Sequence, residues 1–112
     1  MVTGDGGTRA VKVARNQALW REVNERIVSL AATAGEVQFL CECANMDCTE
    51  TLTLSVGEYE HIRSSPVRFP IKLGHDYPEF ETVVAQNEHY AVVQKRGKAA
   101  EVSAALDPRG RS

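Results

Sequence analysis

Three cysteines lie within eight residues of a chain that contains no others. They are Cys41, Cys43 and Cys48, in the segment CECANMDC. Thiolates are ligands for Zn2+, and an odd number of thiols cannot all pair as disulfides within one chain. The alternative, one buried apolar cysteine and two incidental thiols, needs more coincidence than a shared ion does. The segment therefore predicts a metal site.

The spacing of these cysteines, C-x-C-x4-C, differs from the paired CxxC of zinc ribbons. The side chains of a C-x-C pair share one face of a flat strand, but they stand too far apart for each sulfur to lie about 2.3 Å from one ion. The chain must therefore bend between Glu42 and Ala44. A structural zinc site also takes four tetrahedral ligands, so one ligand has to come from elsewhere.

Three histidines compete for the fourth position. His61 falls on the outward face of a predicted short helix, and His89 falls in a predicted turn. His75 ends a predicted strand directly after Gly74, whose missing side chain permits close approach of another loop. The predicted ligands of one structural Zn2+ ion are Cys41, Cys43, Cys48 and His75.

Other occupants of the fourth position lead to other functions. Asp47 or Asp76 would supply an oxygen ligand, and a bound water would leave a zinc enzyme possible with Glu42 or Glu50 as its base. No GxSxG, P-loop, GxGxxG or HExxH pattern is present, so hydrolases, nucleotide-binding proteins and metalloproteases of those types lack their motifs. The sequence therefore favours a non-catalytic binding or regulatory module.

The distribution of charge bears on the partner. No lysine or arginine lies between Ile27 and Ile62, whereas six acidic residues do, and the net charge of the chain is −2. Such a segment favours a bound cation and repels nucleic-acid phosphate. We therefore expect a protein partner and no nucleic acid. The main alternative function is a thiol redox sensor, in which oxidation of Cys43 or Cys48 expels the zinc.

The spacing of apolar residues predicts the helices and strands that position these ligand candidates. A helical pattern begins near Val13, and alternating strands flank the cysteines over residues 37–54. Ser55 and Glu58 match a capping box for a short second helix. The apolar positions expected to face inward on the first helix are Leu19, Trp20, Val23, Ile27, Leu30 and Ala31.

The remaining segments complete an α+β fold. Strands are predicted over residues 68–73, 81–86 and 90–95, and a C-terminal helix over 98–106. Pro70 places the first of these strands at a sheet edge. We expect an N-terminal amphipathic helix packed on a small antiparallel sheet of about five strands, with a short second helix and a short C-terminal helix.

The predicted organisation is one domain. Residues 1–12 are expected to be a disordered lead, 13–106 a single zinc-stabilised α+β domain, and 107–112 a frayed tail. No apolar run approaches the roughly 20 residues of a membrane span, and the first residues lack the apolar segment of a secretory signal. A cytoplasmic location is therefore expected, where clustered cysteines are more often ligands than disulfides.

Several segments resemble a family of short bacterial proteins. The resemblance covers roughly residues 15–109 and rests on CECANMDC, LTLSVGEYEHIRSSPVRF, KLGHD, YAVVQKRG and DPR. The family's pattern includes the three cysteines and a Gly-His pair, which here is Gly74 and His75. No activity is assigned to the family, so the resemblance implies a shared site and no particular function.

Overall fold

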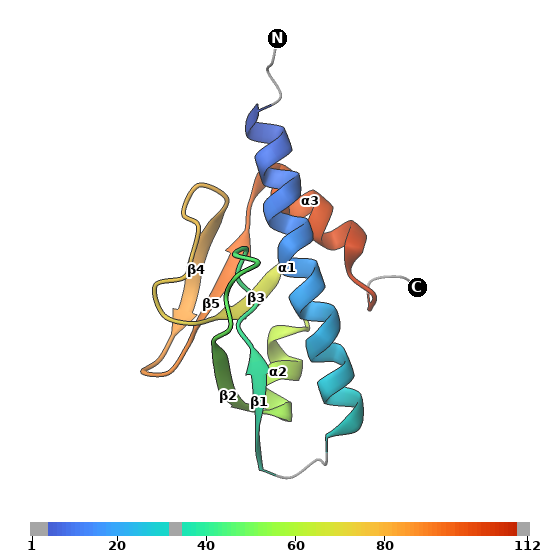
Figure 1. Ribbon diagram of the computed structural model, residues 1–112, viewed down its shortest axis with the longest axis vertical. Coiled ribbons are helices and arrows are strands. Elements are labelled where there is room, and N and C mark those ends of the chain that lie inside the picture. Colours follow the sequence, from blue (N-terminus) through green and yellow to red (C-terminus); the bar gives the residue numbers. More distant parts are fainter. Residues whose placement is uncertain (1–4, 32–34, 110–112) are drawn as a thin grey trace.

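In Figure 1 the long N-terminal helix runs between the strands and the short second helix on one side and the C-terminal helix on the other. The computed structural model describes residues 5–31 and 35–109. The elements in chain order are α1 (Asp5–Leu30), β1 (Glu36–Leu40), β2 (Thr51–Ser55), α2 (Val56–Ile62), β3 (Arg68–Ile71), β4 (Glu81–Gln86), β5 (Ala91–Lys95) and α3 (Gly97–Leu106). The predicted α+β class is confirmed.

The five described strands form two antiparallel sheets. One sheet is the β1–β2 hairpin, and the other has the order β3-β5-β4. The two meet where the chain leaves β1, because the Glu42 N–H donates to Pro70 O at 2.9 Å. Pro70 has no N–H of its own, so this side of β3 cannot form a full ladder. The expected single sheet is therefore divided at the cysteine segment.

Three buried apolar clusters lie among the described residues, and two of them adjoin the strands that flank the cysteines. The first lies between the β1–β2 hairpin and α2, where the Phe39 and Tyr59 rings stack with centroids 4.5 Å apart. The second contains Cys41 and Cys43 together with buried side chains of β3 and β5. The cysteines are therefore part of the core that joins the two sheets.

Helix α2 begins as the sequence predicts. Ser55 Oγ accepts the Glu58 N–H at 3.0 Å, and the Glu58 carboxylate accepts the Ser55 N–H at 2.8 Å. This reciprocal pair is the predicted capping box. The inward side chains of the helix, Tyr59 and Ile62, are buried as expected.

Helix α1 differs from its predicted form at the start. It begins at Asp5 and not near Val13, so residues 5–12 are helical and do not form the predicted lead. Residues 1–4 lie outside the described residues. The helix is longer because its first turns pack on the rest of the protein, and Ala10 and Val13 are buried there.

The predicted inward face of α1 is wrong for three of its six residues, whereas Ile27 packs against the core as predicted. Leu19, Val23 and Leu30 are 50%, 43% and 82% exposed. The side that is buried carries a mixed stripe at three- and four-residue steps: Ala10, Val13, Ala14, Gln17, Arg21 and Asn24. Apolar periodicity identified a helix but assigned its orientation incorrectly, because the surface that α1 covers is partly polar.

Residues 107–109 were predicted to belong to a frayed tail, but the structure shows them attached to the rest of the protein. Asp107 is buried and its Oδ1 lies 2.5 Å from Arg63 Nη2. Arg109 forms ion pairs with Glu60 at 2.6 Å and with Glu25 at 2.8 Å. Ion pairs therefore attach this end of the chain to α1 and α2. Within the described residues no helix is both long enough and apolar enough to span a membrane.

Candidate metal centre

The cysteine segment leaves the regular strand immediately before its first thiol. Strand β1 ends at Leu40, and one further ladder bond joins Cys41 N to Glu50 O at 3.0 Å. A tight turn then returns the chain, with Cys48 N–H donating to Asn45 O at 3.1 Å. The chain bends as the C-x-C spacing requires, and the three thiols come to face one side.

His75 reaches the thiols from a turn after β3. The His75 N–H donates to Lys72 O at 3.0 Å, which closes a four-residue turn, and Gly74 in its third position has φ +83°. A side chain at that φ is strained. The sequence suggested that Gly74 permits close approach of another loop. A Cβ built on Gly74 would meet no atom within 4 Å, so the glycine is needed for the turn and not for such an approach.

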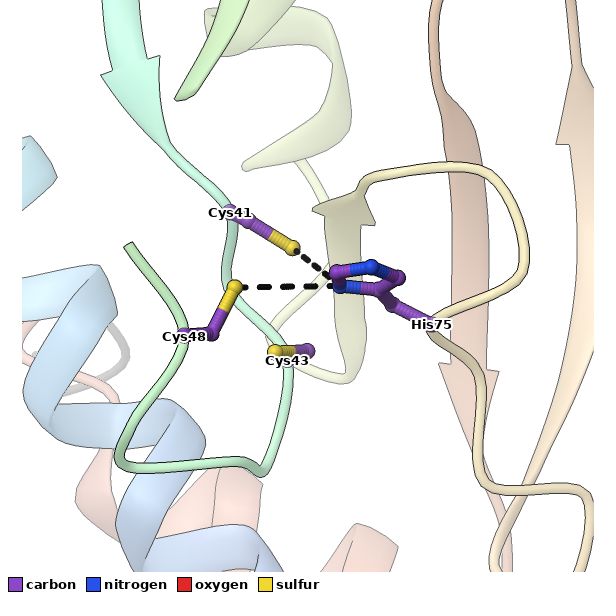
Figure 2. A group of neighbouring side chains, drawn as sticks. All are labelled: Cys41, Cys43, Cys48 and His75. Carbon is purple, nitrogen blue, oxygen red and sulfur yellow. Dashed lines mark hydrogen bonds between the residues drawn. The ribbon is translucent and has the colours of Figure 1, made fainter. Parts of the chain in front are cut away.

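The structure brings all four predicted ligand residues together (Figure 2). Their ligand atoms lie within 4.8 Å of one another. His75 Nδ1 is 3.6 Å from Cys41 Sγ and 3.7 Å from Cys48 Sγ. The three thiols are free of disulfides. Three sulfurs and one imidazole nitrogen around a common centre form a group that can hold a metal ion.

The competing candidates lie elsewhere. Among the described residues, the group that can hold a metal does not include Asp47, Asp76, His61 or His89. His61 and His89 are exposed, on α2 and in the turn between β4 and β5. The geometry thus selects His75 among the histidines.

The three thiols differ in pKa because of a hydrogen bond between Cys41 and Cys43 and because of burial. A hydrogen bond from Cys41 lowers the pKa of Cys43 to about 5, against the effect of burial. The same bond, together with burial, raises the pKa of Cys41 above its usual value. Burial also raises the pKa of Cys48. Cys43 is therefore the first thiolate, and a metal ion would have to displace the protons of the others.

The four residues of the site differ in their exposure to solvent. Cys41 and Cys43 are 2% and 1% exposed, whereas Cys48 and His75 are partly exposed. The Lys72 N–H donates to Cys41 Sγ at 3.1 Å and supports negative charge on that sulfur. A shallow cleft of about 230 Å³ lies beside the site and is lined by Cys43, Asn45, Gly74, His75, Asp76 and Tyr77.

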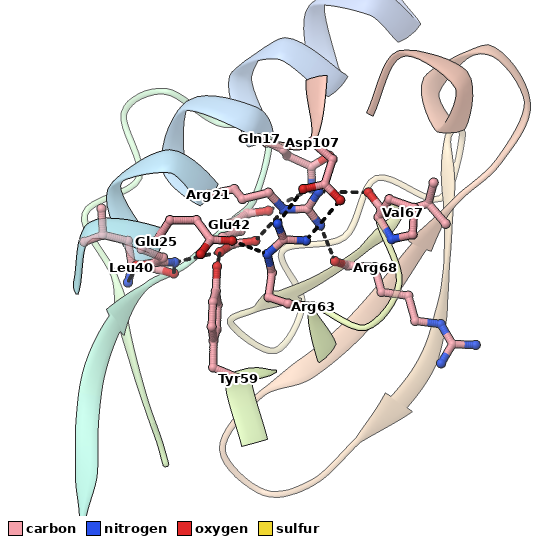
Figure 3. Close-up of polar contacts among 12 residues, drawn as sticks. Gln17, Arg21, Glu25, Leu40, Glu42, Tyr59, Arg63, Val67, Arg68 and Asp107 are labelled. Atoms are coloured by element: carbon pink, nitrogen blue, oxygen red, sulfur yellow. Dashed lines mark hydrogen bonds and ion pairs between the residues drawn. The ribbon is translucent and has the colours of Figure 1, made fainter. Parts of the chain in front are cut away.

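The Glu42 carboxylate lies in a buried polar network (Figure 3). Its Oε2 accepts the Tyr59 hydroxyl at 2.5 Å and Asn24 Nδ2 at 2.8 Å, and its Oε1 lies 3.8 Å from Arg21 Nε. Burial raises the pKa of Glu42, and the charge of Arg21 and these two hydrogen bonds oppose that rise. This carboxylate is therefore committed to α1 and α2 and does not face the metal centre.

Sequence reasoning missed the residues of α1 that contact the cysteine segment. Gln17 Nε2 donates to Glu42 O at 2.8 Å, Asn16 Nδ2 to Ala44 O at 2.8 Å, and Trp20 Nε1 to Asn45 O at 3.4 Å. Irregular backbone leaves carbonyls without partners, and buried carbonyls need donors. Gln17 belongs to the buried stripe of α1, and Asn16 and Trp20 lie beside it. Their three- and four-residue spacing was the available signal.

Comparisons with known proteins add no relative. No protein-family model, no curated protein and no solved structure matches this chain. The resemblance to short bacterial proteins therefore stays a prediction, and the argument for function depends on the site itself.

Proposed function

We propose that the chain is a small zinc-binding domain that acts as a non-catalytic binding or regulatory module. In this proposal one structural Zn2+ is bound by Cys41, Cys43, Cys48 and His75. It would join the β1–β2 loop to the turn that follows β3. The observation that carries the proposal is the convergence of three thiols and one imidazole nitrogen from these two segments.

The distances support zinc. Zinc lies about 2.3 Å from sulfur and roughly 2.1 Å from nitrogen, so at a tetrahedral angle a sulfur and a nitrogen ligand stand roughly 3.6 Å apart. The two Sγ–Nδ1 distances are 3.6 and 3.7 Å. The widest ligand separation, which is within 4.8 Å, needs to close by about 1 Å around an ion. Cys3His is also a ligand set of structural zinc sites.

Two observations favour a structural ion over a catalytic one. His75 Nδ1 lies where a fourth ligand would close the coordination sphere, and catalytic zinc keeps one position open for water. Both proposed bases have other partners, since Glu42 is bonded to Asn24 and Tyr59 and Glu50 lies 3.8 Å from Lys72 Nζ. These contacts account for the acidic residues without a catalytic role.

Metal analysis tests the proposal directly. Protein purified without added metal should contain one zinc per chain, and thiol titration should find three protected thiols that become reactive after chelation. Conversion of Cys43 to serine should lower the bound metal. Metal-free protein with three freely reactive thiols would contradict the proposal.

A redox sensor is the second candidate, and the partial exposure of Cys48 favours it. Cys43 is buried, although it lines the 230 Å³ cleft and its pKa is lowered to about 5. Thiolates that solutes can reach are the ones that peroxide oxidises. A sensor should release zinc in dilute peroxide and take it up again with reductant. Full retention of the metal at concentrations that oxidise a free model thiol would favour the structural role alone.

We infer that a protein partner binds the outer face of α1, here defined by Leu19, Trp20, Val23 and Arg26. A shallow pocket lies on it and is also lined by Glu22. The exposed basic residues of this side of α1, Lys12, Arg15 and Arg26, outnumber that acidic residue. This face is positively charged although the chain as a whole is net negative, so charge complementarity favours an acidic partner.

Affinity capture with the wild type and with Val23→Asp tests the location. A host protein that the wild type retains and the variant loses, at equal zinc content, would support this face. Retention by both would contradict it.

A further inference from the structure

The residue between the first two thiols has a role of its own in the site. We infer that Glu42 is a positioning residue, which fixes the directions of Cys41 and Cys43 by anchoring the opposite side of the chain to α1 and α2. This role rests on the proposed zinc-binding function and concerns how the metal-free site keeps its ligands in place.

The side-chain contacts of residues 41–43, which lie beyond the end of β1, give the first reason. The Glu42 carboxylate accepts from Asn24 and Tyr59, whereas the sulfurs of Cys41 and Cys43 lie in the group of ligand atoms that includes His75, so the carboxylate and the two sulfurs face different parts of the protein. Because Glu42 lies between the two cysteines in the chain, whatever fixes its carboxylate also restricts the two sulfurs. Both of those sulfurs are needed by the same ion.

The contacts of Glu42 hold it in one orientation. Tyr59 and Asn24 donate to the same carboxylate oxygen, at 2.5 and 2.8 Å, from two different helices. The carboxylate is fully buried, and Arg21 is 3.8 Å from its second oxygen. A buried carboxylate that rotated out of this position would lose its donors at a cost larger than that of an ordinary hydrogen bond. The orientation of residue 42 is therefore strongly preferred.

Asn24 extends the same anchorage along the backbone. Its Oδ1 accepts the Leu40 N–H at 2.8 Å, and its Nδ2 donates to Leu40 O at 2.9 Å. The side-chain amide pairs with both backbone groups of Leu40 in the way that a neighbouring strand would. The residue before Cys41 and the residue after it are thus attached to one asparagine, and the sulfur between them has little freedom.

Replacing Glu42 by glutamine tests this role, because the change keeps the shape and removes one acceptor and the charge. Residues that orient metal ligands typically contribute 10- to 100-fold in metal affinity. Glu42→Gln should therefore weaken zinc binding about 10- to 100-fold, as measured by competition with a chromophoric chelator. In the cobalt-substituted protein, the visible absorption bands that report tetrahedral thiolate coordination should weaken or shift.

Two further variants separate positioning from folding. Asp107→Asn makes the same carboxylate-to-amide change in the buried Arg63–Asp107 pair, outside the cysteine segment, so it should lower the melting temperature and leave zinc affinity within about twofold. Tyr59→Phe removes one donor to Glu42 while keeping the ring stacked on Phe39. It should weaken zinc binding severalfold even if Glu42→Gln does not fold.

The outcomes are distinct. Zinc affinity and cobalt spectrum unchanged in both Glu42→Gln and Tyr59→Phe would overturn the positioning role while leaving the zinc site intact. An equal loss of affinity in Asp107→Asn would also overturn it, because the effect would then follow general stability. A wild-type chain that binds no zinc would overturn the proposed function and this role with it.

Discussion

The four proposed ligands are unequal in their surroundings, and this decides how replacements should behave. Cys41 is buried, accepts the Lys72 N–H at 3.1 Å and lies within the core between the two sheets. His75 is partly exposed and sits on a turn. Cys41→Ser should therefore abolish zinc binding, whereas His75→Ala should weaken it and retain some metal, because water can take the fourth position. Titrations that rank His75→Ala as the more damaging change would contradict this order.

Gly74 sets the direction of His75 through its backbone. At φ +83° an alanine costs on the order of 1–2 kcal/mol, and relief of that strain would move the imidazole. Gly74→Ala should lower both the free energy of unfolding and zinc affinity, measured by urea titration and chelator competition. Gly57→Ala is the matched control, since Gly57 is helical and an added Cβ meets Ser55 Oγ at 3.8 Å. It should be neutral or stabilising by up to about 1 kcal/mol.

Among single residues, the sequence could predict the metal-ligand candidates, because these depend on residue type. Thiols and imidazoles can bind a metal in any fold, so Cys41, Cys43, Cys48 and His75 could be selected from residue type, from spacing and from the predicted strand end before His75. The role of Glu42 could not be predicted in the same way. It depends on Asn24 and Tyr59, which lie 18 and 17 residues away along the chain and become neighbours only in the fold.

Helix α1 shows where the pattern of an element is misleading. Its apolar residues recur with helical period, but several of them face outward, while Gln17, Arg21 and Asn24 face the protein. The reason lies in the surface on which α1 packs, which is partly polar. Gln17 and Asn24 donate to the carbonyls of Glu42 and Leu40, and Arg21 donates to those of Pro66 and Arg68. Buried carbonyls need donors. The spacing of the polar residues is visible in the sequence of the helix, but the carbonyls that they meet are not.

The orientation of α1 leads to a prediction that contrasts two of its residues. Leu19→Ser should change the free energy of unfolding by less than about 0.5 kcal/mol, because Leu19 is 50% exposed. Asn24→Ala should cost about 2–3 kcal/mol, because it leaves the backbone groups of Leu40 and the Glu42 carboxylate short of buried partners. Urea unfolding of the zinc-loaded variants measures both. A costly Leu19→Ser with a harmless Asn24→Ala would mean that the helix faces the other way.

For the whole molecule, the proposed zinc ion would act as a cross-link. It would close the 27-residue separation between Cys48 and His75, which by chain entropy is worth about 3–4 kcal/mol, and structural zinc contributes on the order of 10 kcal/mol of apparent folding free energy. Chelation should therefore abolish cooperative melting followed by circular dichroism, and added zinc should restore it. An unchanged melting temperature after removal of zinc would contradict a structural ion.

The C-terminal attachment predicts a dependence on pH. Burial alone raises the pKa of Asp107, but hydrogen bonds from Arg63 and Arg109 outweigh it, so the pKa lies below its usual value. A lowered pKa contributes stability that is complete above the unfolded pKa of about 3.9 and is lost as the pH falls through the folded value. Asp107→Asn should thus cost about 3 kcal/mol at pH 7.

The difference in unfolding free energy between wild type and this variant should shrink below roughly pH 4. Using the difference cancels the loss of zinc that acid causes in both proteins. A difference that stays constant to pH 3 would show that Asp107 contributes no charge to the pair.

The separation of the ligands along the chain also has a consequence for synthesis. The three thiols leave the ribosome first, and His75 follows Cys48 by 27 residues, a delay on the order of seconds at roughly 5–20 residues per second. During that interval the nascent chain presents three thiols with no imidazole beside them. Strand β5, which pairs with both β3 and β4, emerges later still. An ion bound once His75 has emerged would hold the first hairpin to the turn after β3 before β5 completes the second sheet, so the supply of zinc during translation would influence the yield of folded protein.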